Sequence, residues 1–175
     1  MFLELLKTIT GFLEKKNIEY MVSGSFAVNV YCLPRMTLDI DIVIELNEKN
    51  LNDFLEMFKS GYYIDEGTVL TEIRRKGMFN VIDHTSGLKI DFIIRKETDF
   101  RRLEFSRKRR LMIENIPVWI VSTEDLVISK MEWIQQIQSD KQMQDIANLM
   151  KLPDIDREYI SSWCHKLSLN TFNLI

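Results

Sequence analysis

Two aspartates, Asp39 and Asp41, lie two positions apart inside an apolar run of the sequence. Because side chains alternate along a β-strand, both carboxylates are expected on the same face of one strand. Two unit charges about 4 Å apart repel by roughly 4 kcal/mol at an effective dielectric constant of about 20. A divalent cation removes that penalty, so this spacing predicts a pair of metal ligands.

A third acid of the same kind is Asp91, which is the only charge in the apolar segment Ile90–Ile94. If its strand lies beside the strand of Asp39 and Asp41, three carboxylates converge on one point. Hard oxygen ligands of this kind suit Mg²⁺ or Mn²⁺, with substrate phosphates completing the coordination. Each aspartate alone is more often a residue that faces solvent or pairs with a base, so the combination carries the prediction.

The segment Ser23-Gly24-Ser25 lies upstream, between a short apolar strand and a stretch with helical character. Backbone N–H groups at the start of a helix bind anions such as phosphate. Carboxylates for a metal beside a phosphate cradle predict a site that handles nucleotides.

Composition argues against several classes of protein: disulfide-rich, zinc-binding, secreted and membrane-spanning. The chain has 175 residues, 46% of them hydrophobic, and a net charge of −3, which predicts one ordered domain, or a domain with a small helical appendage. Only Cys32 and Cys164 are present, without C-x-x-C spacing, so a disulfide framework or zinc site is not expected. The amphipathic N-terminus is no signal peptide, and no apolar run approaches the roughly 20 residues of a membrane span. We therefore expect a cytoplasmic protein without a membrane partner.

The elements that must position these residues follow from apolar periodicity and turn residues. Helices are predicted over about residues 2–15, 26–31, 47–58, 68–76, 122–136, 141–151 and 155–167, and strands over 20–22, 38–45, 79–84, 89–94, 111–114 and 118–121. Asn47 is the expected N-cap of the third helix, and Ser122 with Asp125 forms a capping box. The order predicts an α/β fold, with residues 1–121 as a core whose later strands are mostly antiparallel, and residues 122–175 as a C-terminal helical cap.

At this point the sequence resembles a known family. Gly24-Ser25, followed by Pro34-Arg35-Met36-Thr37-Leu38-Asp39-Ile40-Asp41, is similar to the signature of the polymerase-beta-like nucleotidyltransferase superfamily. More narrowly, it resembles the small prokaryotic nucleotidyltransferases of the type IV toxin–antitoxin (AbiEii-like) group. The family's strand acid matches Asp91, and its later pattern matches Val121–Leu126, Lys130 and Lys141 through Asp145-Ile146, so the resemblance covers about residues 17–150. The sequence departs from the family at Cys32, where glycine is common, and at Gln142, where a second acid is common.

The resemblance implies a nucleotidyltransferase-type mixed β-sheet flanked by helices, and an enzyme that transfers NMP from an NTP to an acceptor hydroxyl with release of pyrophosphate. It assigns Asp39, Asp41 and Asp91 to the metal, Mg²⁺ or Mn²⁺, with Asp91 also as general base. It assigns Gly24 and Ser25 to the triphosphate and Arg35 and Lys130 to neutralising the phosphates. The ordinary alternatives are that Lys130 is a solvated helix lysine, that Arg35 pairs with Asp39 or Asp41, and that Asp145 caps or pairs within the helical tail.

The acceptor is less defined. Residues 95–110 hold eight basic and three acidic side chains, a local excess of five positive charges. This stretch would steer tRNA or another RNA toward the metals, which slightly favours an RNA 3′ end as acceptor; the alternative is a solvated helix face with internal ion pairs. A hydroxyl of a cognate toxin or antitoxin protein comes next, and an aminoglycoside stays open. The competing hypothesis is a catalytically degenerate module that binds nucleotide or a partner.

Overall fold

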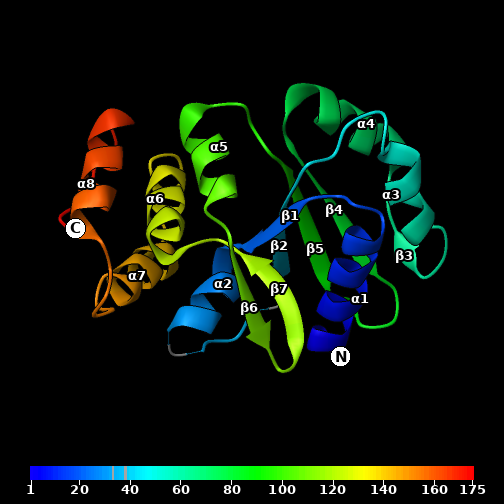
Figure 1. Ribbon diagram of the computed structural model, residues 1–175, viewed down its shortest axis with the longest axis horizontal. Coiled ribbons are helices and arrows are strands. Elements are labelled where there is room, and N and C mark those ends of the chain that lie inside the picture. Colours follow the sequence, from blue (N-terminus) through cyan, green and yellow to red (C-terminus); the bar gives the residue numbers. More distant parts are fainter. Residues whose placement is uncertain (33, 38) are drawn as a thin grey trace.

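The computed structural model describes residues 1–32, 34–37 and 39–175. Within these ranges the chain forms a seven-stranded sheet in the order β3-β4-β5-β2-β1-β7-β6 (Figure 1). The strands are β1 (Tyr20–Ser23), β2 (Asp39–Ile44), β3 (Tyr62–Tyr63), β4 (Met78–Asp83), β5 (Lys89–Ile94), β6 (Arg109–Ile113) and β7 (Ile116–Ile120). The predicted α/β class with a mixed sheet is confirmed.

Helices flank this sheet on both faces and at both ends. They are α1 (Phe2–Lys15), α2 (Gly24–Tyr31), α3 (Leu51–Met57), α4 (Glu66–Arg75), α5 (Asp99–Ser106), α6 (Thr123–Ile134), α7 (Asp140–Leu149) and α8 (Arg157–Lys166). Figure 1 shows α6, α7 and α8 gathered at one end of the molecule, and α3 and α4 at the other. None of the described helices has the length and apolarity needed to span a bilayer.

The central strands pair in both directions, whereas the outer hairpins are antiparallel. Strand β2 pairs in parallel with β5, and β1 pairs antiparallel with β2 and parallel with β7. The β4–β5 and β6–β7 hairpins are antiparallel, as the sequence predicts. The strand of Asp91 therefore lies directly beside the strand of Asp39 and Asp41.

The two faces of β2 have opposite character. Ile40, Ile42 and Ile44 are fully buried on one face. On the same face of the neighbouring strand, the ring centroid of Phe92 lies 5.0 Å from that of Phe54 in α3. This apolar packing fixes the strand pair and leaves Asp39 and Asp41 on the opposite face.

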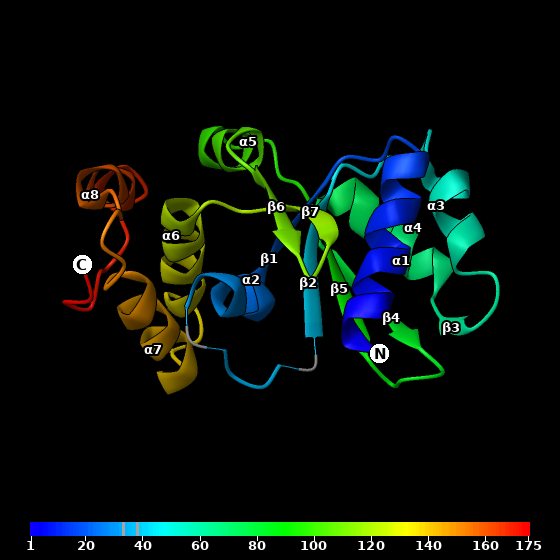
Figure 2. The same cartoon turned by 60° about the horizontal axis from the view of Figure 1, so that its bottom comes forward.

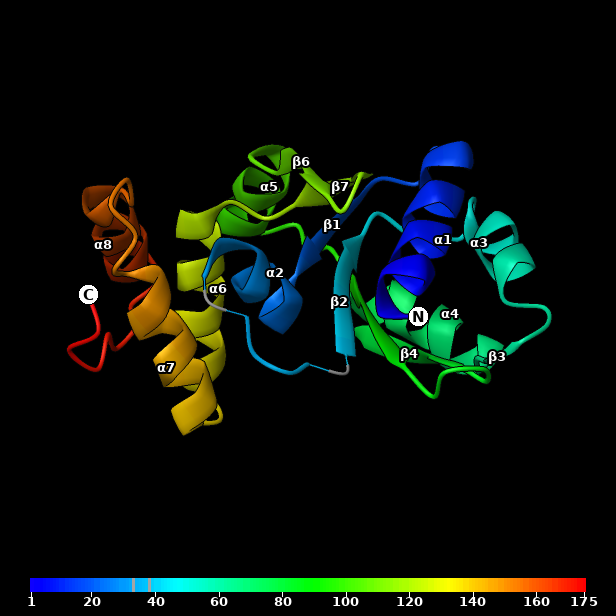
Figure 3. The same ribbon diagram turned by 90° about the horizontal axis from the view of Figure 1, so that it is seen from below.

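Helix α2 lies over that second face. Figures 2 and 3 both show α2 between β2 on one side and α6 on the other. Its first residue directly follows the last residue of β1, and β1 ends opposite Asp41. The start of α2 and the carboxylates of β2 and β5 are therefore brought together by the β1–α2 turn.

Several predicted boundaries differ from the structure. The third helix begins at Leu51 with Asn50 as its N-cap. The Asn47 side chain accepts a hydrogen bond from the Lys49 N–H in the turn that precedes the helix. The basic stretch contains an additional helix, α5, and Arg109 and Arg110 belong to strand β6. The N-cap role of Ser122, whose side chain accepts from the Asp125 N–H, is confirmed.

The predicted strand start at Leu38 lies outside the described residues.

Candidate active site

Asp41 and Asp91 are direct neighbours across the parallel strands β2 and β5. Side chains of paired residues project from the same face of a sheet, so both carboxylates point toward α2. Asp39 shares this face, and its register partner is Lys89. The predicted convergence of the two strands is confirmed, and the three acids share one face.

Gly24 is the point where the chain passes closest to Asp41. Its φ is +63°, and a Cβ placed there would lie 1.8 Å from Oδ2 of Asp41. Only glycine accommodates both this backbone conformation and this approach. Ser25 follows, and its backbone N–H donates to the Asp41 carboxylate. The glycine therefore lets the start of α2 reach the carboxylates.

The charge of Asp41 is only partly compensated. Burial raises the pKa of Asp41, and the neighbouring negative charge of Asp91 raises it further. The positive charge of Lys130 and the hydrogen bond from Ser25 act in the opposite direction. The net upward direction of the pKa means that burial and the charge of Asp91 together outweigh the effects of Lys130 and Ser25.

Lys89 is a cation inside this acidic face. Its Nζ lies 2.8 Å from Oδ2 of Asp91 and 3.9 Å from Oδ1 of Asp39. The hydrogen bond to Asp91 raises the pKa of Lys89, partly offset by burial, and the charges of Asp39 and Asp41 add to the effect. Sequence reasoning missed this residue, although strand alternation places position 89 on the same face as position 91.

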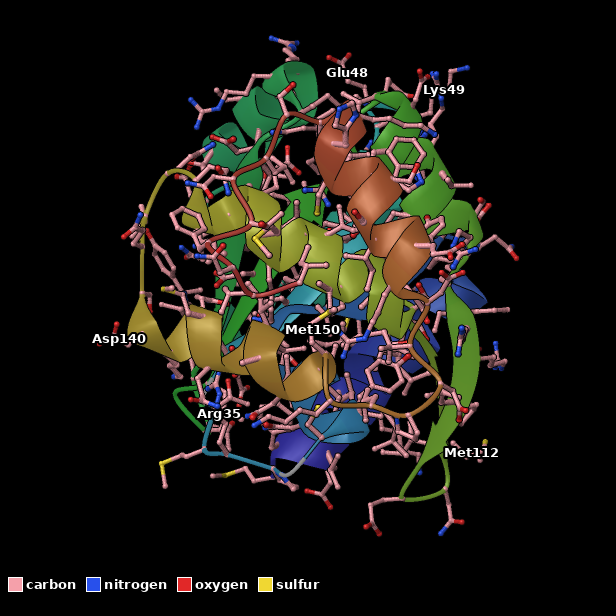
Figure 4. The ribbon with its side chains drawn as sticks, turned by 90° about the vertical axis from the view of Figure 1, so that its left-hand side faces the viewer. Arg35, Glu48, Lys49, Met112, Asp140 and Met150 are labelled. Atoms are coloured by element: carbon pink, nitrogen blue, oxygen red, sulfur yellow. The ribbon has the colours of Figure 1, made fainter. Side chains whose placement is uncertain are left out.

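Arg35 is held by Asp145 of α7 and not by Asp39 or Asp41, so that part of the sequence interpretation is wrong. Nε donates to Oδ1 at 2.9 Å, and Nη2 donates to Oδ2 at 2.6 Å. Nη2 also donates to the Ser25 hydroxyl at 2.8 Å. Figure 4 shows Arg35 close beside α7. The guanidinium thus links the start of α2 to the C-terminal helices.

The Arg35 backbone is fixed as well. The side-chain amide of Asn29 donates to the Arg35 carbonyl at 2.7 Å and accepts from the Arg35 N–H at 3.0 Å. This amide pair ties the segment after α2 back onto α2 itself. Asn29 is a second positioning residue that the sequence pattern did not single out.

Lys130 is buried, so the alternative of a solvated lysine is wrong. Its Nζ donates to Oδ2 of Asp145 at 3.0 Å and to Oε1 of Gln142 at 2.6 Å. Burial lowers the pKa of Lys130, while the charges of Asp145 and Asp41 act to raise it. Asp145 therefore anchors both cations that the sequence assigns to phosphate binding.

Asp145 is itself one of the most deeply buried acids. Burial alone raises its pKa, but the hydrogen bond from Arg35 and the charge of Lys130 outweigh that effect and lower it. The expectation that Asp145 pairs within the helical tail is confirmed for Lys130 of α6, whereas its second partner, Arg35, lies outside the tail. Two cations around one carboxylate leave a net positive charge beside Ser25.

The donor set fits a divalent cation in chemistry and charge. Carboxylate oxygens are the ligands that Mg²⁺ and Mn²⁺ prefer, and the ammonium group of Lys89 already lies between Asp39 and Asp91. Across the described ranges, no group of three or more histidine, cysteine, aspartate or glutamate side chains is arranged to hold a metal ion as it stands. The three-carboxylate metal centre therefore stays a prediction.

The basic stretch is mostly neutralised within the protein. Among the described residues, seven of its eight cations form ion pairs with acids: Arg95 with Glu45 and Glu97, Arg101 with Glu104 and Glu132, Arg102 with Asp99, Arg107 with Glu124 and Asp125, Lys108 with Glu19, Arg109 with Glu124, and Arg110 with Glu14. The stretch begins one residue after β5 ends, about 13 Å along the strand from Asp91. The interpretation as a face with internal ion pairs fits this arrangement.

A cavity of about 540 Å³ adjoins Arg35 and Thr37. It lies between the start of α1, helix α2, residues 34–37 and the end of β6. Its described lining is Phe2, Leu3, Phe26, Asn29, Val30, Pro34, Arg35, Met36, Thr37, Met112 and Ile113. Arg35 and Met112 mark its two sides in Figure 4. The lining is mainly apolar and, in its described part, contains no acid.

Comparison with known proteins gives matches only among solved structures. No protein-family model matches the sequence, and no curated protein matches it. A crystal structure of a Thermotoga maritima protein assigned as a nucleotidyltransferase matches with a TM-score of 0.55 and 15% identity, over 94% of this chain and 93% of that one. This chain has the nucleotidyltransferase fold.

Two structures of the antibiotic-resistance factor ANT(2″)-Ia show the same fold. The solution structure matches with a TM-score of 0.52 and 12% identity, over 94% of this chain and 83% of that one. The crystal structure of its complex with adenylyl-2″-tobramycin matches with a TM-score of 0.51 and 13% identity, over 94% and 88%. The nucleotidyltransferase fold expected from the sequence is thus confirmed, and the narrower AbiEii-like group stays a prediction.

Proposed function

We propose that this chain is a metal-dependent nucleotidyltransferase that transfers NMP from an NTP to an acceptor hydroxyl and releases pyrophosphate. The observation that carries the proposal is the direct pairing of Asp41 with Asp91 opposite the start of α2. Two acids paired in register on neighbouring apolar strands destabilise the fold, because burial and mutual repulsion both disfavour their charges. A role in binding a cation accounts for their presence.

The residues divide into two groups around the start of α2. Asp39, Asp41 and Asp91 would hold Mg²⁺ or Mn²⁺, which supplies electrostatic stabilisation of charge on the reacting phosphate when bound. Helix α2 has no side-chain cap from Ser23. The Ser25 N–H donates to Asp41 in the structure, and the triphosphate would take over this N–H together with that of Gly24 when it binds. Arg35 and Lys130 supply positive charge on the side of Asp145.

In the reaction, the acceptor oxygen forms a bond to the α-phosphorus of the NTP as the bond from that phosphorus to the bridging oxygen of pyrophosphate breaks. Asp91 accepts the proton of the acceptor hydroxyl. Catalysis of this kind rests on positioning and electrostatics, because the protein forms no covalent bond to the substrate.

For the acceptor, we propose a hydroxyl on a partner protein. The basic stretch no longer favours RNA, because its charges are paired with acids. The cavity beside Arg35 and Thr37 is apolar, which suits a protein segment better than a phosphate backbone. An aminoglycoside is polycationic, and the only charged side chain in the described lining is that of Arg35. The toxin–antitoxin setting remains part of this proposal.

The test is transfer of label from each of the four α-labelled NTPs, with Mg²⁺ or Mn²⁺, to the protein and RNA fractions of a cell extract. The Asp41→Asn variant should lose labelling by at least about a hundredfold, as expected when a charge acting in the transition state is removed. Asp154→Asn, which changes an exposed aspartate after α7, should keep full activity. Equal labelling by the wild type and Asp41→Asn would rule out the proposed site.

The same assay separates the alternatives. Labelled RNA with unlabelled protein would replace the protein acceptor by an RNA 3′ end. A chain that binds nucleotide without labelling protein, RNA or an added aminoglycoside would be the degenerate module, because binding requires only the phosphate cradle.

A further inference from the structure

Lys89 places a positive charge among the acids of the proposed metal site. It is the first residue of β5 and the direct register partner of Asp39. Because it lies two residues before Asp91, its side chain projects from the same face of the sheet. Its ammonium group is within 2.8 Å of Asp91 and 3.9 Å of Asp39. One lysine therefore bridges acids of two neighbouring strands.

This bridge takes up Oδ2 of Asp91, one of the two carboxylate oxygens that this residue could offer to a metal ion. A carboxylate oxygen that binds Mg²⁺ lies about 2.0–2.1 Å from the ion. The Lys89 ammonium group lies 2.8 Å from Oδ2 of Asp91. It would therefore lie very close to a divalent ion bound by the same carboxylate. Like charges at such a separation repel by several kcal/mol at an effective dielectric constant of about 20. Lys89 and the metal thus compete for Asp91.

We propose that Lys89 is the built-in counter-ion of Asp39 and Asp91, and that a divalent cation must displace its ammonium group to enter the site. The inference rests on the proposed metal site. The Lys89 side chain is 39% exposed and has a flexible four-carbon stem, so the displaced group has a path into solvent. The lysine stabilises the carboxylates without metal and lowers their affinity for free metal.

One consequence concerns the order of binding. Free metal must overcome the positive charge of Lys89, whereas a metal–nucleotide complex brings its own negative phosphates. Lys89 therefore penalises free metal more than metal that arrives with the NTP. In thermodynamic terms, it contributes to positive coupling between metal and nucleotide.

The test is Mn²⁺ binding without nucleotide, measured from the electron paramagnetic resonance signal of free Mn²⁺. Lys89→Met and Lys89→Gln should bind Mn²⁺ about tenfold more tightly than the wild type. Lys89→Arg keeps the charge and should bind as weakly as the wild type. Lys96→Met is the matched control, since it removes an exposed lysine beyond the other end of β5. Asp91→Asn should abolish the tightened binding.

A second measurement needs no metal. In EDTA, Lys89→Met should melt at a lower temperature than the wild type, because Asp39 and Asp91 lose their counter-ion. Added Mn²⁺ should close the gap. Equal Mn²⁺ affinity of the wild type, Lys89→Met and Lys89→Gln, with binding abolished in Asp91→Asn, would overturn the inference while leaving the metal site in place. Absence of Mn²⁺ binding in every variant would overturn both.

Discussion

Asp145 holds Arg35 along one edge of its guanidinium, with Nε on Oδ1 at 2.9 Å and Nη2 on Oδ2 at 2.6 Å. The same carboxylate accepts from Lys130 at 3.0 Å. A residue of the C-terminal helices thereby fixes two cations, one after α2 and one in α6. Helix α7 is therefore tied by hydrogen bonds to two residues of the candidate site.

The first prediction follows from this arrangement. Asp145→Asn removes the negative charge that orients Arg35 and Lys130. It also raises the net charge of these three side chains by one positive unit. We expect kcat to fall by at least about tenfold, because the cations lose their orientation, without a rise in KM for the NTP. Steady-state kinetics with varied NTP would measure both constants.

Asp125→Asn is the matched control. Asp125 is fully buried in α6 and binds Arg107 and the Tyr159 hydroxyl, away from Arg35 and Lys130. Both variants should lose about 3 kcal/mol of unfolding free energy, since each leaves a cation without its buried partner. Only Asp145→Asn should change kcat; equal kcat losses in the two variants would mean that Asp145 acts through stability alone.

Sequence reasoning predicted the strand pair and its acids because these depend on local patterns. The alternation around Asp39 and Asp41, the isolated acid Asp91 and the glycine at position 24 all have short-range signatures. The turn between β4 and β5 and the cap at Ser122 are likewise local, and both are found in the structure. Strand alternation alone places Asp39 and Asp41 on one face, whereas the place of Asp91 on that face depends on the pairing of β2 with β5.

The partners of Arg35 and Lys130 were not predictable in the same way. Asp145 lies 110 residues from Arg35 in the sequence, and no periodic pattern encodes how α7 packs against α2. The charge of the basic stretch, residues 95–110, was overstated for a related reason. Its partners Glu14, Glu19 and Glu45 come from distant elements, so a local charge count does not include them. Long-range ion pairing appears only when the chain is folded.

The second prediction tests the close approach at Gly24. In Gly24→Ala, the new Cβ would lie 1.8 Å from Oδ2 of Asp41, so the carboxylate or the start of α2 must move. We expect nucleotidyl transfer to fall by about a hundredfold, the cost of misplacing a reacting group by roughly 1 Å. Labelling assays at saturating NTP would measure the loss.

Gly87→Ala provides the control for backbone strain. Gly87 has nearly the same φ, +68°, but a Cβ there meets no atom within 4 Å. Each variant should lose about 1–2 kcal/mol of stability from the left-handed conformation. If Gly87→Ala reduced transfer as much as Gly24→Ala, the contact with Asp41 would not be the reason for the glycine.

The third prediction concerns the two thiols. Cys164 of α8 is buried, and burial raises its pKa to about 11, whereas Cys32 is partly exposed. Iodoacetamide at pH 8 should therefore alkylate Cys32 in the folded protein and Cys164 only after unfolding, as mass spectrometry would show.

A raised thiol pKa stabilises the fold below the ordinary value of 9.0, and this contribution is lost as pH rises through about 11. Between pH 9 and about 11, the wild type should therefore lose stability relative to Cys164→Ala. In the alkylation experiment, rapid reaction of Cys164 at pH 8 would contradict its burial.

The fourth prediction uses the raised pKa of Asp41, which burial and the charge of Asp91 cause. A carboxyl group whose pKa is higher in the folded state stabilises the fold below its ordinary value of 3.8, and this contribution is lost as pH rises through the raised pKa. In EDTA at pH 7, Asp41→Asn should therefore melt at a higher temperature than the wild type, and the difference should shrink toward pH 4. Asp154→Asn should show no such trend. A gap of constant size from pH 4 to pH 7 would show that the amide stabilises by packing. A gap that closes on acidification shows that the negative charge of Asp41, which is buried and lies beside Asp91, destabilises the fold when no cation is bound.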